Sequence, residues 1–389
     1  MRRLSVFVVV LSLAGNAGAA GPPLVERYLH SGELAKGEQA LEAALAANPR
    51  DDQIRFGLGV LRFLRGIERL GQSLREYGVK SESTDFPFLR LPVPHNPEPA
   101  AITYTAFRRV ADDFVRDLTA AEATLAGITD DGVKLPLRLA DIRMDLAGTG
   151  KPTDRFLDVI KKVMRQQQFD FLRGNPDFLV CFDRGDVAWL RAYCHLLTGM
   201  LDFYLAFDTE QIFNLSSDEV FARPKPPPPP RENRQWDEVL RVIVVKEPAR
   251  LGRFRRHMIK VAELNRETWK YIRAETDDDH EWLPNAKQKG VLGMPVRDDM
   301  VDAWLGMMAE FEALLDGKRT LGSPKDGKGL SLRALLDDPP EKLDFAGGFP
   351  RNLPDRYFSE APEVDGRSLW RVMAVFQNTT AVAYWAWFN

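Results

Sequence analysis

The sequence predicts a mainly α-helical protein, an irregular helical bundle that begins with a pair of repeat-like helices. Apolar residues recur every three or four positions over most of the chain, as one face of a helix requires. Alternating apolar and polar runs, which predict strands, are few. The apolar fraction of 44% is ordinary for a globular protein, and the length of 389 residues suggests about two domains.

Residues 1–20 are predicted to be a secretory signal peptide. The segment MRRLSVFVVVLSLAGNAGAAG has two early arginines, an apolar run and an A-x-A cleavage pattern at Ala17 and Ala19. The apolar run is about 11 residues long, whereas a membrane-spanning helix needs about 20. We therefore expect a periplasmic or secreted protein with no transmembrane segment after signal cleavage.

The charge and the missing motifs narrow the functional classes. The formal charge is −3, and it becomes −5 once the two arginines of the signal are removed. Nucleic acid is not an expected partner, because phosphate binding requires a basic surface. The sequence has no dinucleotide-binding, phosphate-binding-loop, nucleophile-elbow or zinc-protease motif. A protein or a small molecule remains as the expected ligand.

The first two predicted helices span residues 33–47 and 52–77. The first is rich in Ala, Leu and Glu and ends at Asn48-Pro49, which is a helix stop. The second has an apolar stripe at helical spacing, made of Ile54, Leu58, Leu61, Phe63, Leu64, Ile67, Leu70 and Leu74. The two helices should pack against each other.

This N-terminal segment resembles a tetratricopeptide repeat. The positions that carry the resemblance are Leu24, Tyr28, Gly37, Leu41, Ala44 and Pro49, and the pair Leu58-Gly59 matches the start of a second unit. Arg62, Arg75 and Gly78 depart from the pattern, because small or apolar residues are expected there. The resemblance implies one repeat and part of another within residues 21–80, and a protein-binding role with little groove.

The rest of the chain is predicted as a helical domain over 81–223, a Pro-rich linker over 224–234 and a C-terminal helical region over 235–389. Five prolines in 81–99 predict an extended loop, and five consecutive prolines in the linker predict a stiff polyproline II spacer. The predicted helices lie at about 103–126, 136–147, 154–172, 186–207, 235–245, 249–276, 298–316 and 367–387. This remainder resembles exported bacterial proteins of no established activity.

A loop that resembles a degenerate calcium-binding loop follows residue 144. Asp145 and Gly150 match the first and sixth positions of an EF-hand loop, and Thr149 and Asp154 offer further oxygens. Phe156 stands where the bidentate glutamate belongs. The alternative interpretation is a Gly-rich turn between two helices.

A line of polar residues is predicted within the apolar helix 186–207. Arg191, His195 and Asp202 share one face at helical spacing. They form either a satisfied hydrogen-bond network or one wall of a pocket. Cys181 and Cys194 are either a disulfide, which an oxidising compartment permits, or two small buried apolar residues.

Arginines gather at the start of the predicted helix 249–276. The positive end of a helix dipole favours anions, so Arg253 and Arg256 beside it could hold an anion from a ligand or from a neighbouring helix. The alternative is a set of solvated arginines in weak surface ion pairs.

The segment TDDDHE, residues 276–281, is the candidate metal site. Asp277, Asp279, His280 and Glu281 carry the side chains that divalent cations use, although about three at most can converge from this segment. The alternatives are a helix break, with Thr276 capping a new turn, and a catalytic acid or base. A divalent metal is thus the one cofactor that the sequence suggests.

Two functional hypotheses follow from these observations. The first is an exported, non-catalytic binding or scaffold protein of the bacterial envelope, which the repeat-like helices and the missing catalytic motifs favour. The second is a metal-dependent hydrolase, or a metal-binding or ligand-binding protein, that uses the cluster from Asp277 to Glu281.

Overall fold

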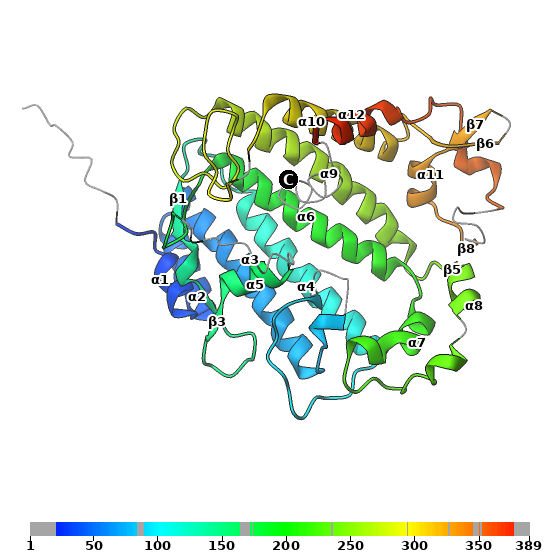
Figure 1. Cartoon of the computed structure of the whole chain (residues 1–389), viewed down its shortest axis with the longest axis horizontal. Coiled ribbons are helices and arrows are strands. Elements are labelled where there is room, and N and C mark those ends of the chain that lie inside the picture. Colours follow the sequence, from blue (N-terminus) through cyan, green and yellow to red (C-terminus); the bar gives the residue numbers. More distant parts are fainter. Residues whose placement is uncertain are drawn as a thin grey trace, which may run out of the picture.

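The computed structural model describes residues 21–83, 89–163, 172, 174–234, 236–293, 295–325, 327–344, 350 and 352–376. The described chain is mainly helical, as the sequence predicts, and its strands are short (Figure 1). The predicted signal peptide and the end of the last predicted helix lie outside the described residues. No helix in the described ranges is both long enough and apolar enough to cross a membrane.

The N-terminal helices form where the sequence predicts them. They are α1 (Glu26–Ser31), α2 (Leu34–Ala47) and α3 (Asp52–Glu76). The Asp51 side chain caps α3 by accepting a hydrogen bond from Ile54 N at 2.9 Å. Leu41 and Leu61 are fully buried, so the apolar stripe faces the core.

Long helices lie side by side and build the body of the molecule (Figure 1). Helix α3 packs on α4 (Tyr104–Leu125), α4 on α6 (Arg184–Ala206), and α6 on α9 (Pro248–Ala274). The contact between α6 and α9 is the most extensive one in the described chain. Helix α10 (Asp298–Leu315) covers α9, and α12 (Gly366–Phe376) covers α10.

Shorter elements fill the ends of this body. The remaining helices are α5 (Phe156–Val163), α7 (Glu210–Val220), α8 (Trp236–Arg241) and α11 (Leu332–Asp337), with 3-10 turns at Ser81–Ser83, Leu139–Asp141, Arg231–Asn233 and Asp355–Tyr357. The strands are β1 (Leu135–Arg138), β2 (Arg143–Met144), β3 (Asp154–Arg155), β4 (Leu179–Phe182), β5 (Val242–Val244), β6 (Leu321–Lys325), β7 (Lys328–Leu330), β8 (Lys342–Asp344) and β9 (Phe358–Ser359). They pair antiparallel as β1-β4, β2-β3, β5-β8 and β6-β7-β9.

The prediction of a helix over 136–147 is wrong. These residues form most of β1, a 3-10 turn and β2. Leu135 and Leu137 are fully buried while Arg138 is exposed, and Leu135 pairs with Phe182 of β4. Pro136 has no amide hydrogen to donate within a helix. The short apolar run instead buries its side chains as a strand that pairs with β4.

One further helix is shorter than predicted, and another is only partly described. The helix expected over 235–245 stops at Arg241, because the β-branched run Val242–Val244 forms β5. The helix expected over 154–172 is described only as Phe156–Val163, and residues 164–171 lie outside the described ranges.

The buried core crosses the predicted domain boundaries. One apolar cluster contains Leu41, Leu190 and Val301, which come from the three helical segments that the sequence separates. The start of the Pro-rich segment is also attached, because Lys225 N donates to Ile102 O at 2.7 Å. A second apolar cluster contains Leu74, Leu118 and Phe213, and the partly buried Phe63 and Ile67 pack against both clusters.

Candidate functional site

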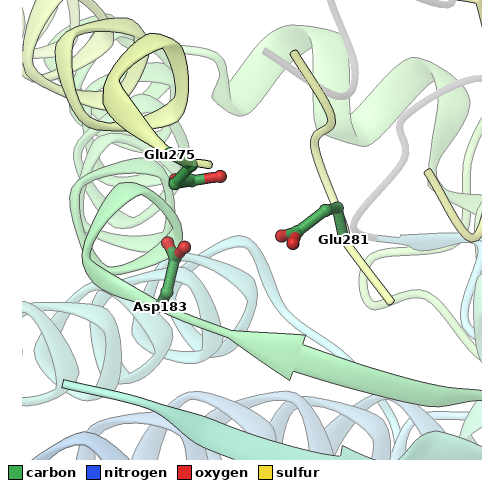
Figure 2. Close-up of side chains that lie close together, drawn as sticks. All are labelled: Asp183, Glu275 and Glu281. Atoms are coloured by element: carbon green, nitrogen blue, oxygen red, sulfur yellow. The ribbon is translucent and has the colours of Figure 1, made fainter. Parts of the chain in front are cut away.

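Three carboxylates meet where α6 begins and α9 ends. Asp183, Glu275 and Glu281 each present an oxygen, and these oxygens lie within 4.8 Å of one another. Figure 2 shows the three side chains pointing into a common space from the start of α6, the end of α9 and the loop after α9. Within the described ranges, this acidic triad is the one such group of metal-ligating side chains.

Asp183 is held by the start of α6. It is the N-cap residue, and its Oδ1 accepts hydrogen bonds from Gly185 N at 2.8 Å and Asp186 N at 3.4 Å. Asp186 Oδ2 accepts in return from Asp183 N at 3.0 Å, which completes a capping box. The helix start thus fixes one side of the triad.

Gly185 leaves room for the carboxylates. A Cβ atom at this position would lie 3.3 Å from Asp183 Oδ1, 3.4 Å from Glu275 Oε1 and 2.9 Å from Ile272 Cγ1. A side chain there would push into both the triad and the end of α9, so glycine allows the two helix ends to approach.

Glu275 follows directly after α9, which ends at Ala274. Asn285 Nδ2 donates to Ile272 O at 2.9 Å and to Glu275 O at 3.3 Å, and thereby satisfies carbonyl groups that the helix end leaves open. Gln288 Nε2 donates to Glu275 Oε2 at 3.2 Å. No N–H or O–H group of the described chain donates to the buried Glu275 Oε1, and Asp183 is the side chain that can share a proton with Glu275.

Glu281 is buried in the loop, with only 4% of its surface exposed. Its Oε1 accepts a hydrogen bond from Asp279 N at 2.9 Å, and its backbone carbonyl accepts one from Val291 N at 2.9 Å. Burial raises the pKa of Glu281, and the nearby charges of Asp183 and Asp277 act in the same direction. The loop therefore holds a carboxylate at a position where its negative charge is unfavourable.

The triad carries more negative charge than its surroundings compensate. Burial, followed by the charge of Asp183, raises the pKa of Glu275 to about 9. Burial and Asp183 also raise the pKa of Asp186, which is 4% exposed, well above its usual range. Asp183 and Glu275 can share a hydrogen bond only if one of them binds a proton. The cluster must therefore take up protons or a cation.

The donor set decides which cations fit the triad. All three ligands are carboxylates, the hard oxygen donors that Ca²⁺ and Mg²⁺ prefer.

No protein-family model, curated protein or solved structure matches this chain. The chemistry of the site is therefore argued from its own residues.

A polar cleft of about 350 Å³ opens beside the triad. It is lined by Arg273, Glu275, Asn285, Ala286, Lys287, Asp298 and Asp302. Glu275 belongs to both the triad and the cleft wall, whereas Asp183 and Glu281 do not line the cleft.

Only one residue of the metal cluster predicted at 277–281 reaches the triad, and it is Glu281. Asp277 contacts Lys134, and Asp279 Oδ2 lies 3.8 Å from Lys134 Nζ. His280 is exposed and has a left-handed backbone, with φ of +61°. The side chains diverge because α9 has already ended, so the segment turns instead of continuing one helical face.

Sequence reasoning missed Asp183 and Glu275 as ligands. The signal for Asp183 was the spacing of the capping box, Asp183 with Asp186 three residues later, directly before an apolar helix. Glu275 belongs to the acidic run at the end of α9, but 92 positions separate it from Asp183 in the chain. Such a convergence depends on the packing of α6 on α9, which local patterns do not contain.

In the loop that resembles a calcium site, the carboxylates accept hydrogen bonds from backbone N–H groups of the same loop. Asp145 accepts hydrogen bonds from Thr149 N at 3.1 Å and Gly150 N at 2.6 Å. Asp154 Oδ2 accepts from Leu146 N at 2.8 Å. These contacts are typical of a turn closed by aspartates, in which the carboxylates replace missing backbone hydrogen bonds.

The other predicted site residues lie along α6 and α9. Arg253 Nε donates to Asp202 Oδ2 at 2.9 Å, and Arg191 Nε donates to Glu122 Oε1 at 3.0 Å. His195 lies between these two pairs, while Arg256 is exposed. The predicted polar line thus contacts side chains of both α4 and α9.

The two cysteines are buried and free. Cys181 lies on β4 and Cys194 on α6, and no disulfide joins them. Burial raises the pKa of the Cys181 thiol to about 12, and Asp279 contributes to this shift.

Proposed function

We propose that this protein is an exported binding protein of the bacterial envelope that holds Ca²⁺ between Asp183, Glu275 and Glu281. The observation that carries the proposal is the convergence of three carboxylates from three segments around a buried oxygen, Glu275 Oε1, to which no N–H or O–H group of the described chain donates. The absence of common catalytic motifs and the repeat-like N-terminal helices favour binding over catalysis.

The spacing of the triad suits one calcium ion. Ca²⁺ binds oxygens at about 2.3–2.6 Å, so oxygens on opposite sides of the ion lie about 4.6–5.2 Å apart. The triad oxygens lie within 4.8 Å of one another. Three carboxylates supply up to six oxygens, and water from the adjoining cleft can complete the coordination shell.

A cation removes the electrostatic cost that the triad otherwise bears. Without one, the cluster reduces its repulsion by keeping a proton on Glu275, whose pKa is raised to about 9. A divalent ion neutralises the same charges and displaces that proton. Calcium binding should therefore release protons and tighten as the pH rises.

Calorimetry and thermal melting of the purified mature protein test this function. Ca²⁺ at 100 times its dissociation constant should stabilise the wild-type protein by about 2.7 kcal/mol. Glu275→Gln and Glu281→Gln should each weaken binding by at least about tenfold, because even the loss of a residue that only supports a metal ligand typically costs about 10–100-fold in affinity. Asp277→Asn is the matched control, because Asp277 faces Lys134 outside the triad.

Two results would contradict the calcium-binding function. One is a wild-type protein whose melting temperature and calorimetric heat do not change with Ca²⁺. The other is equal loss of binding in Asp277→Asn and Glu275→Gln. Mg²⁺ and Mn²⁺, titrated in parallel, show whether another hard cation occupies the site.

The polar cleft favours metal-dependent hydrolysis as a second candidate function. It places Arg273 and Lys287 beside Glu275, so a substrate anion could approach a bound cation there. Hydrolysis of a chromogenic phosphate ester and a carboxylate ester, with Ca²⁺, Mg²⁺ or Mn²⁺, tests this candidate. Turnover that requires the cation and disappears in Glu275→Gln would support hydrolysis. No turnover with either ester would contradict hydrolysis, and binding would remain as the proposed function.

A further inference from the structure

Two histidines face each other across the largest helix contact in the described chain. His195 of α6 and His257 of α9 bring their Nδ1 atoms to 2.8 Å, and their ring centroids lie 5.1 Å apart. This centroid distance equals the Nδ1–Nδ1 distance plus the centroid-to-nitrogen radii of the two rings. The two nitrogens therefore lie on the line that joins the ring centres, and each points directly at the other.

Such a contact requires one proton between the nitrogens. An imidazole nitrogen either donates through N–H or accepts through its lone pair, and 2.8 Å is a hydrogen-bond distance. With no proton between them, two lone pairs would face each other. With two protons, two N–H groups would face each other without an acceptor. One shared proton is the arrangement that fits the geometry.

The outer nitrogens of the pair face carboxylates. His195 Nε2 lies 3.4 Å from Glu122 Oε1 of α4, and His257 Nε2 lies 4.0 Å from Asp202 Oδ2 of α6. A carboxylate favours N–H on the nitrogen that it faces. Both carboxylates thus direct a proton to Nε2 and leave the two Nδ1 atoms to share one proton, which gives the pair a single positive charge.

We propose that His195 and His257 form an acid-sensitive latch between α6 and α9, closed by one shared proton and opened by a second. In the closed state the proton joins the two helices. A second proton places two N–H groups and two positive rings against each other at 2.8 Å, so the contact must separate. The latch adds a response to acid that is independent of calcium binding by the triad.

The charged groups around the latch explain why the second proton binds only in acid. Glu122 of α4 and Asp202 of α6 favour a positive pair, whereas Arg191 of α6 and Arg253 and Arg256 of α9 oppose it. Burial alone would raise the pKa of Glu122, but the hydrogen bond to His195 and the charge of Arg191 lower it, so Glu122 stays ionised. Burial, and then the charge of His195, lower the pKa of His257 to about 4. The second proton therefore enters only in acid.

The spacing suits a proton better than a metal ion. A zinc ion on the line between two imidazole nitrogens would need them about 4 Å apart, because each Zn–N bond is about 2.0–2.1 Å long. The observed 2.8 Å is shorter than this by more than 1 Å. A proton fits without any movement of α6 against α9.

Nitrogen NMR of the full mature chain counts the protons on the pair directly. The chain has five histidines, so the ring signals can be assigned with single substitutions. The expected result is one proton between the two Nδ1 atoms at neutral pH and a second proton that binds only near pH 4. Independent titration of both rings near pH 6.5, the ordinary value for histidine, would overturn the latch.

Hydrogen exchange then tests whether the second proton opens the helices. Amide protection factors in α6 and α9 around His195 and His257 should fall at least tenfold between pH 6 and pH 4 in the wild-type protein. This acid response should be absent in His257→Gln, which cannot take up the proton, and retained in the control His95→Gln, an exposed loop residue. An unchanged acid response in His257→Gln would contradict the proposal. If His257→Gln does not fold, the NMR titration of the wild-type protein decides alone.

Discussion

Asp202 and Arg250 form a buried ion pair between α6 and α9. Arg250 Nη1 donates to Asp202 Oδ1 at 2.8 Å. Arg250 is 8% exposed and Asp202 is 1% exposed. Arg253 donates to the same carboxylate, and Asp112 and Glu247 accept from Arg250. Charges buried in this way are stable only while each of them keeps its partners.

Asp202→Ala should lower the free energy of unfolding by about 1.5–3 kcal/mol, because it removes the charge-assisted hydrogen bonds from Arg250 and Arg253 and leaves Arg250 with Asp112 and Glu247 alone. Urea denaturation measures the loss. The control is Asp113→Ala, which removes a pair between Asp113 and Arg116 on the exposed side of α4 and should cost about 1 kcal/mol or less. Equal losses in the two variants would show that the buried ion pair contributes no more to the free energy of unfolding than the exposed one.

Glu275→Gln should make the cation-free protein more stable at pH 8 and should remove its response to calcium. The folded pKa of Glu275, about 9, lies above the ordinary value of 4.5. The protonated carboxyl therefore contributes stability below pH 4.5, and this contribution is lost as the pH rises through 9. Glutamine keeps the neutral shape at every pH.

Melting temperatures in a chelator, measured from pH 5 to pH 9, test this prediction. The wild-type value should decline more steeply with pH than the value for Glu275→Gln, and added Ca²⁺ should flatten the wild-type curve only. Parallel curves for the two proteins in the chelator would mean that Glu275 ionises normally.

Gly59→Ala should destabilise the protein and Gly306→Ala should not. A Cβ at position 59 of α3 would lie 2.4 Å from Leu125 Cδ2 of α4, whereas a Cβ at position 306 of α10 would meet no atom within 4 Å. Overpacking costs about 1–3 kcal/mol, and replacing glycine by alanine inside an open helix gains about 0.5–1 kcal/mol. Urea denaturation should therefore give changes of opposite sign, and an unchanged or higher stability of Gly59→Ala would contradict the close contact of α3 with α4.

Cys181 and Cys194 should react slowly with a thiol reagent in the folded protein and rapidly in denaturant. Both side chains are buried, and burial raises the pKa of each thiol, so little reactive thiolate is present at pH 7. Two thiols titrated after unfolding without a reductant would establish that both are free. Recovery of thiols only after reduction would instead demonstrate a disulfide.

The sequence predicts the long helices well, because their signals are local. The apolar stripe of residues 52–77 and the Asn48-Pro49 stop place α2 and α3 to within a residue or two at each end. The same reasoning fails at 136–147, where a short apolar run is compatible with a helix or a strand. The difference is decided by β4, whose pairing with β1 is distant in sequence.

The candidate site follows the same division. The sequence by itself determined that acidic residues gather after α9 and that Glu281 is one of them, because composition and order are local properties. Only the tertiary structure decided that Glu281 turns inward while Asp277 and Asp279 face Lys134. It also brought Asp183 and Glu275 together, and His195 and His257, through the packing of α6 on α9. The physical reason is that burial, charge compensation and proton sharing depend on which surfaces meet, and this is a property of the whole folded chain.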